Sequence, residues 1–265
     1  MSKALLKSAL FAVAPRWTAT RMAARARAHS HAVVRHHQLH TLTAALVDHL
    51  GRHVLEGPCQ GTVLTPMCDA EHLGPFLLGV YESELDRAWD SIFKRSYGQI
   101  LDVGAKFGYY AVGLARRYPE STVVAFDIDP WSQRALREMV AANGVGNLEI
   151  AGFCDGRWLN AMLQPSALIV SDCEGFEVEL FEGATNTALR SATLLIETHD
   201  SFVPDATTRV RARFQATHEV EVFTQASPRR SSNADLSFLS PSERHSAEHE
   251  MRGEQTWLLC TPHMV

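Results

Sequence analysis

The chain contains 265 residues, of which 46% are hydrophobic and 21% are charged, and its formal net charge at pH 7 is −5. No apolar run approaches the length that spans a bilayer, so the composition argues against an integral membrane protein and indicates one large α/β domain with an extension. The five cysteines are scattered and include no C-x-x-C pair, which argues against a zinc knuckle or a disulfide framework and favours a reducing, cytoplasmic location.

The first forty residues form a basic arm on an acidic body. They contain seven of the 25 basic residues and no acidic residue, which leaves 18 basic against 30 acidic residues, or −12, in the rest of the chain. A secretory signal is disfavoured because Lys7 interrupts a short apolar run and Pro15 follows a cleavage-like A-V-A. Three interpretations of residues 1–40 stay open: a solvated tail, a helix packed on the body or lying peripherally on an anionic membrane, and a transit-peptide-like leader.

Residues 41–97 are expected to form a helical cap. An amphipathic helix is predicted over 42–55, before a Gly-Pro pair, and a second helical apolar pattern lies within 73–94. Tyr81 and Glu82 precede the strongest part of that second pattern. They belong either to a helix that covers the sheet edge or to the mouth of a ligand pocket, where they would contact the substrate.

The stretch QILDVGAKFGYYAVGLARRYPESTVVAFDIDP, residues 99–130, predicts a strand, a glycine turn, a helix and a second strand that ends on a carboxylate. Gly104 and Gly108 relax the backbone between the first strand and the helix. Asp127 ends the second strand nineteen residues after Gly108. A glycine turn alone is weak evidence, but an acidic residue at this strand tip accepts hydrogen bonds from ribose hydroxyls in nucleotide-binding βαβ units. The combination predicts a nucleotide-cofactor site.

The glycine spacing distinguishes between cofactors. A pyrophosphate-binding G-x-G-x-x-G turn would need a glycine where this chain has Lys106, which argues against a nicotinamide dehydrogenase. The observed D-x-G-x-x-x-G pattern instead resembles motif I of the class I methyltransferases, which bind S-adenosylmethionine. This resemblance implies that Asp102 faces the amino acid part of the cofactor, and it places Ile128 beside the ribose carboxylate Asp127.

Further strands are predicted at 148–152 and 167–170, with a helix at 131–143 between the first βαβ unit and the third strand. Asp155 follows the third strand and either accepts from the adenine amino group or caps a helix over 157–163. The fourth strand is wholly apolar and delivers three carboxylates to the edge where open α/β sheets bind ligands. Glu174 and Glu177 also fit a helix start, whereas Asp172 stands directly at the strand end and is a candidate functional residue.

A fifth strand at 193–197 ends beside His199 and Asp200. His199 is either a base within reach of Asp172 or a solvent-exposed loop histidine. Asp172 and Asp200 could share a divalent metal, but we predict no metal site. A helix at 207–217, a strand at 220–224 and a last strand at 255–261 complete the chain, and the polar segment 227–253 is predicted as a long loop, either a lid or disordered.

These segments together resemble the FkbM family of S-adenosylmethionine-dependent methyltransferases over residues 78–262. LDVGAKFGYYA is similar to its motif I, AFDIDP to its ribose strand, and SDCEGFEVELFEGA to its most distinctive block, D-x-E-G-x-E. GVYESEL, LLIETHD and the final WLLCTP also fit. The resemblance implies a Rossmann-like, seven-stranded, mostly parallel sheet with helices on both faces over 98–265, preceded by the cap and the arm.

The resemblance also implies site roles. Asp102, Gly104 and Gly108 would bind the methionine portion of the cofactor, and Asp172 and Glu174 would lie beside the acceptor. The chain departs from the family at Lys106, where asparagine is common, and at the ribose carboxylate, which is more often glutamate.

Methyl transfer from a sulfonium requires an in-line arrangement and removal of a proton from the acceptor. We therefore expect O-methylation of a hydroxyl on a sugar or other polar small molecule, with His199 or Asp172 as base. A nucleic-acid acceptor is not expected, because the tip after the fourth strand is SDCEGF rather than N-P-P-Y-like and the body is acidic. The alternative is a cofactor-binding scaffold without turnover that docks through its basic arm.

Overall fold

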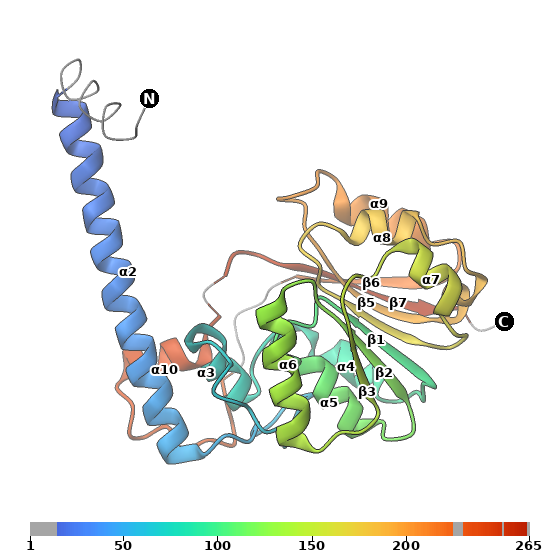
Figure 1. The fold of residues 1–265 in the computed structure, drawn as a ribbon, viewed down its shortest axis with the longest axis horizontal. Helices are drawn as coiled ribbons and strands as arrows, with labels where there is room; N and C mark the ends of the chain where they lie inside the picture. Colours follow the sequence, from blue (N-terminus) through green and yellow to red (C-terminus); the bar gives the residue numbers. More distant parts are fainter. Residues whose placement is uncertain (1–14, 225–229, 251, 264–265) are drawn as a thin grey trace.

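The computed structural model describes residues 15–224, 230–250 and 252–263. Within them, seven strands form one sheet in the order β3-β2-β1-β4-β5-β7-β6 (Figure 1). The strands are β1 (Gln99–Val103), β2 (Thr122–Phe126), β3 (Leu148–Ala151), β4 (Leu168–Ser171), β5 (Thr193–Thr198), β6 (His218–Thr224) and β7 (Thr256–Pro262). All neighbouring pairs are parallel except those of β7, which runs antiparallel to both β5 and β6.

The predicted α/β fold of the class I methyltransferases is confirmed, and each predicted strand forms within two residues of its expected bounds. The helical elements are α2 (Pro15–Leu50), α3 (Ala70–Leu78), η1 (Ser83–Leu85), α4 (Asp86–Ile92), α5 (Tyr109–Arg117), α6 (Pro130–Asn143), α7 (Gly156–Met162), α8 (Glu177–Glu182), η2 (Thr187–Ser191), α9 (Ala206–Phe214) and α10 (Pro241–Glu248). Helices α7, α8 and α9 cover one face of the sheet and α4, α5 and α6 the other (Figure 1).

The central strands are apolar on both faces because both faces are covered. In β1, Leu101 and Val103 belong to the core under α7 to α9, whereas Ile100 belongs to the core under α4 and α5. All five residues of β1 are buried, as a parallel strand between two helical layers requires. The strand order reverses beside β1, where β4 rather than β3 takes the next position. Open α/β sheets bind ligands at such a switch point, outside the carboxyl ends of the strands.

The cap differs from its sequence-based prediction. The helix predicted over 42–55 ends at Leu50, because Gly51 adopts a positive φ of 74° and His53 then pairs with Val63 in an isolated β-bridge. The pattern within 73–94 is also broken: α3 ends at Gly79 in the left-handed conformation, and the chain turns before η1 and α4. This break leaves Tyr81 between α3 and η1, where it lines a cavity, and Glu82 at the N-cap of η1.

The polar segment 227–253 was predicted as a long loop, and this prediction is wrong where residues 241–248 form α10. Ser240 and Glu243 form a reciprocal capping box at its start, with Pro241 at the first helical position. Helix α10 packs against α3 and α2. The contact with α3 is close, since a Cβ on Gly74 would lie 2.8 Å from the carbonyl oxygen of Ala247.

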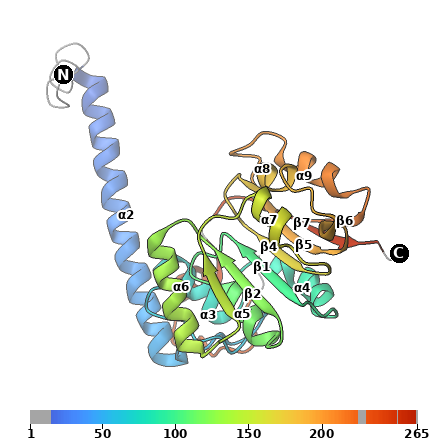
Figure 2. The same cartoon turned by 45° about the vertical axis from the view of Figure 1, so that its right-hand side comes forward.

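The arm is helical from residue 15 onward, and residues 1–14 lie outside the described residues. The C-terminal turns of α2 contact α3 and α10, and its N-terminal turns project from the body (Figures 1 and 2). Leu39, Leu42 and Leu46 are buried, whereas Val33 and Val34 are each 55% exposed. Among the described helices, none is both long and apolar enough to cross a membrane. A peripheral membrane contact of the arm stays a prediction.

We predict that Leu46→Ala lowers the free energy of unfolding by about 3 kcal/mol, because it empties a fully buried position between α2 and α3. The matched control is Val34→Ala on the projecting part of the same helix, which should change stability by less than about 0.5 kcal/mol. Urea denaturation of the full chain measures both. Equal effects of the two substitutions would show that α2 is not packed on the body.

Candidate active site

A cavity of about 440 Å³ opens at the carboxyl edge of the sheet, beside the switch point between β1 and β4. It is lined by the loops after β1, β2, β3, β4 and β5, by α3 and by the segment before β7. Its lining residues are His72, Tyr81, Val103, Gly104, Lys106, Phe126, Asp127, Ile128, Gly152, Phe153, Cys154, Asp172, Cys173, Glu174, Phe176, Glu197, His199, Arg252 and Gln255. A larger hollow of about 870 Å³ lies between α2 and α10, but it contains none of the predicted site residues.

The glycine turn after β1 is shaped by the loop after β4. Gly104 has a φ of 91°, and a Cβ there would lie 1.6 Å from the backbone oxygen of Asp172. Gly108 has a φ of 86°, and a Cβ there would lie 2.2 Å from Leu136. The positive φ favours glycine at both positions, and at Gly104 the backbone oxygen of Asp172 also excludes a side chain. Gly104 lines the cavity, whereas Gly108 is packed beneath it against α6.

Asp102 lies under the turn rather than in the cavity. It is buried, and burial together with the nearby charge of Asp172 raises its pKa to about 7. The backbone N–H of Ala111 in α5 donates a hydrogen bond to the Asp102 carboxylate, which partly offsets this rise in pKa. Asp102 is thus placed to tie the turn to the helix that follows, and its predicted contact with a cofactor stays a prediction.

Asp127 stands at the tip of β2, as predicted, and faces the turn. Its two carboxylate oxygens accept from the backbone N–H groups of Lys106 and Asp129, each at 2.8 Å. Each oxygen keeps a further lone pair for a ligand. Ile128 and Phe153 flank this carboxylate with side chains that are 74% and 58% exposed. A carboxylate between exposed apolar groups suits a nucleoside, whose ribose is polar and whose base is flat and apolar.

Asp155 caps α7, because its side chain accepts from the N–H of Trp158 at 2.9 Å. It does not line the cavity, although the preceding residues 152–154 do. The helix-cap alternative is therefore confirmed, and a contact with adenine stays a prediction.

Lys106 reaches the cavity mouth from a positive φ of 47°, with its Nζ 3.2 Å from Nε2 of His72. His72 in turn contacts Asp69, with 2.6 Å between Nδ1 and Oδ1.

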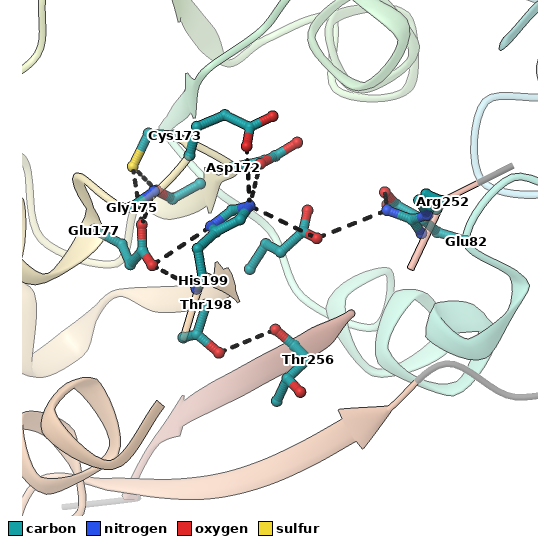
Figure 3. Close-up of polar contacts among 12 residues, drawn as sticks. Glu82, Asp172, Cys173, Gly175, Glu177, Thr198, His199, Arg252 and Thr256 are labelled. Atoms are coloured by element: carbon teal, nitrogen blue, oxygen red, sulfur yellow. Dashed lines mark hydrogen bonds and ion pairs between the residues drawn. The ribbon is translucent and has the colours of Figure 1, made fainter. Parts of the chain in front are cut away.

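The loops after β4 and β5 bring Asp172 and His199 together in the cavity (Figure 3), and Glu174 lies beside them. Nε2 of His199 lies 3.5 Å from Oδ1 of Asp172 and 3.6 Å from Oε2 of Glu174. The prediction that His199 lies within reach of Asp172 is confirmed. Because His199 is only 7% exposed, the solvent-exposed alternative is wrong.

Glu177 holds this arrangement in place. It is fully buried at the start of α8 and accepts from the backbone N–H groups of Gly175 at 2.9 Å and His199 at 2.7 Å. Its Oε1 also lies 3.5 Å from Nδ1 of His199 (Figure 3). Burial alone lowers the pKa of His199, but Glu177, Asp172 and Glu174 together outweigh it, so the pKa is raised. Burial raises the pKa of Asp172 as well.

Two charged residues of the cavity were missed by the sequence analysis. Glu197 at the end of β5 is 2% exposed, and burial with the nearby charge of Asp172 raises its pKa to about 10. Arg252 comes from the segment before β7, with Nη1 3.7 Å from Oε1 of Glu197. Glu197 could have been found as a carboxylate at a parallel strand end. Arg252 gives no such signal, because only the tertiary fold brings its segment to the site.

Tyr81 lines the cavity mouth as predicted, while Glu82 lies behind it and is 1% exposed. Glu82 is 3.0 Å from Arg252, and burial raises its pKa to about 8 despite that contact.

The prediction that Asp200 belongs to the site is wrong. Its carboxylate accepts from the side chain and, at 3.3 Å, from the backbone N–H of Thr207 in α9, and it does not line the cavity. A metal shared by Asp172 and Asp200 therefore does not fit this geometry.

No family model matches the chain. Over 100 residues it is 33% identical to the ribosomal RNA small subunit methyltransferase C of Stutzerimonas stutzeri, a match that covers 38% of this chain and 27% of that protein. The chain thus spans about a quarter of the length of this curated relative.

Several solved structures are similar at low identity. An rRNA methylase from Streptococcus thermophilus is 11% identical with a TM-score of 0.48 and covers 68% of this chain and 97% of its own. A putative O-methyltransferase from Klebsiella pneumoniae is 12% identical with a TM-score of 0.46, covering 74% and 90%. The O-methyltransferase TomG from Streptomyces achromogenes, in complex with SAM, is 15% identical with a TM-score of 0.43, covering 64% and 76%. The fold assignment rests on the strand order described above.

We predict that Gly104→Ala destabilises the protein by more than about 3 kcal/mol, because the new methyl group would overlap the backbone oxygen of Asp172 and φ is positive. Gly98→Ala is the matched control at the other end of β1, where a Cβ meets nothing within 4 Å. Its effect should stay below about 1 kcal/mol. Chemical denaturation compares the two, and a tolerated alanine at 104 would contradict the close approach of the loops after β1 and β4.

Proposed function

We propose that this protein is an S-adenosylmethionine-dependent methyltransferase that methylates a hydroxyl group on a sugar or another polar small molecule. One observation carries the proposal. A single cavity holds Asp127 after β2, the glycine turn after β1 and, on the other side of that turn, the acidic groups Asp172 and Glu174 beside His199. The partial similarity to an rRNA methyltransferase supports a methyl-transfer reaction.

The cofactor end fits an adenosyl ligand. Gly104 lines the cavity at the end of β1, and because it has no side chain the loop after β4 can approach it closely. Asp127 is held by two backbone N–H groups with lone pairs to spare for ribose hydroxyls, and Ile128 and Phe153 offer apolar surface for a base. Lys106 and His72 place positive or donor groups at the same mouth, where a cofactor carboxylate would be accommodated. When bound, S-adenosylmethionine supplies an activated methyl group.

The acceptor end fits a hydroxyl. Asp172 and His199 are held in place, Asp172 by the loop after β4 and His199 by Glu177, so either group can hold the acceptor proton without reorganising. Asp172 is suited to this role because burial raises its pKa toward neutral pH, which makes the carboxylate a stronger base. Tyr81 and Arg252 line the same part of the cavity and supply donors to a polar substrate.

The name of the curated relative suggests RNA as an alternative methyl acceptor. The carboxylates at the acceptor end of the cavity argue against it. Asp172 and Glu174 line the cavity together, and negatively charged carboxylates repel a phosphate backbone. A small polar acceptor meets no such repulsion. A scaffold that binds the cofactor without turnover would bind S-adenosylhomocysteine but would not transfer a methyl group.

Isothermal titration with S-adenosylhomocysteine is expected to show one site, weakened at least tenfold by Asp127→Ala because the ribose loses its acceptor. Asp129→Asn is the control, since it keeps the side-chain oxygen that accepts from Ser132 and caps α6. Circular dichroism checks that both variants fold. Parent-like affinity of Asp127→Ala would remove the proposed cofactor site.

Methyl transfer from labelled S-adenosylmethionine to a glycan and polyol panel, detected as a mass shift, should fall more than tenfold in both Asp172→Asn and His199→Ala. Asp200→Asn provides a neighbouring carboxylate that faces α9 instead of the cavity, and its rate should stay within about twofold of the parent. Parent-like rates in both site variants would rule out the proposed acceptor chemistry. A protein that binds the cofactor but modifies nothing in the panel would favour the scaffold.

A further inference from the structure

The spacing of the three groups at the acceptor end suits a shared ion better than mutual hydrogen bonds. The separations of 3.5 and 3.6 Å from Nε2 of His199 to Asp172 and Glu174 exceed the hydrogen-bond range of about 2.7 to 3.2 Å. Two ligand atoms each about 2.1 to 2.3 Å from one ion lie about 3.0 to 3.8 Å apart when they are neighbours in its coordination shell. One donor atom from each of the three residues lies within 4.8 Å of the other two.

The histidine provides a second, independent observation. His199 is more than nine-tenths buried, and its Nε2 points toward Asp172 (Figure 3) and lies 3.6 Å from Oε2 of Glu174. Within the described part of the chain, Nδ1 of His199 and Oδ1 of Asp172 are both buried without a hydrogen-bond partner. Nδ1 faces the fully buried carboxylate of Glu177 at 3.5 Å. A carboxylate behind one ring nitrogen is the arrangement that orients a histidine for metal binding through the other.

The local charge also calls for a cation. Asp172 and Glu174 both face Nε2 of His199. Arg252 pairs with Glu197, Glu82 and Glu250, at 3.7, 3.0 and 2.5 Å. Its charge is therefore shared among other carboxylates. Two carboxylates at short range repel each other unless a cation lies between them, and the side chain of Glu174, 74% exposed, leaves a path for an ion to enter.

We propose that Asp172, Glu174 and His199 bind one divalent metal ion at the acceptor end of the cavity. Two carboxylates and one imidazole suit Mn²⁺ or a similar first-row ion, and the three side chains leave coordination positions open toward the cavity. The role of the ion rests on the proposed function: it would bind the acceptor oxygen and lower the pKa of its hydroxyl, with His199 as a ligand instead of a base. Asp200, considered for such a site from the sequence, is replaced by Glu174 and His199.

Mn²⁺ binding to the metal-free full chain can be followed by the loss of the free-ion electron paramagnetic resonance signal. We expect one site per chain, weakened at least tenfold by Glu174→Gln and by His199→Ala, because each removes a ligand. Glu174 is the safer variant for folding, since its side chain is mostly exposed. Asp200→Asn is the matched control and should bind Mn²⁺ like the parent.

Absence of stoichiometric Mn²⁺ binding, or equal affinity in the parent and both ligand variants, would overturn the inference. Titration of S-adenosylhomocysteine into the metal-free protein separates this outcome from failure of the proposed function. A chain that binds the nucleoside but not Mn²⁺ loses only the metal site. A chain that binds Mn²⁺ with the expected variant pattern but not the nucleoside keeps the metal site and loses the proposed function.

Discussion

The close approach of two loops at the centre of the sheet is the constraint on which the site depends. Parallel pairing of β1 with β4 sets Val103 opposite Ser171, so the chains that leave these strands emerge side by side. The backbone N–H of Asp172 donates to the carbonyl of Val103 at 2.9 Å, and its carbonyl occupies the space where Gly104 has no side chain. This contact between the two backbones thus sets both the spacing of the two loops and the position of Asp172. A shift of either loop would alter both ends of the cavity together.

The charges of the site are organised in two layers. Asp172, Glu174 and His199 face the cavity, and Glu177 supports them from behind through two backbone N–H groups. Glu82, Glu84 and Glu250 surround Arg252 on the far side of Glu197. Removing one member of such a network leaves its partner buried and unpaired, which costs more than the pair contributes. The segment before β7 is therefore tied to the cap by electrostatics, and through Glu197 to the acceptor end.

The sequence predicted those parts of the site that follow from local pattern. Asp127 and Asp172 stand at ends of parallel strands, and such ends converge on one edge whatever the loops do. His72 and Arg252 could not be placed in this way, because helix packing and a long connection bring them to the cavity. The capping box at Ser240 was readable in the sequence, but the polar composition around it obscured α10. Asp200 was misplaced because the chain turns directly after β5, and in that turn its carboxylate accepts from Thr207 in α9.

The side of the reacting methyl group on which the carboxylates lie determines whether they help the proposed reaction. Carboxylates next to the sulfonium would stabilise the bound cofactor more than the transition state, because the positive charge on sulfur declines as the methyl group leaves. Carboxylates next to the acceptor act in the opposite sense, since positive charge develops on the hydroxyl and its proton must be taken up. Asp172 and Glu174 lie after β4, two strands away from Asp127 after β2. In the proposed reaction this separation places the negative charge of these two residues on the side of the acceptor, where it favours transfer.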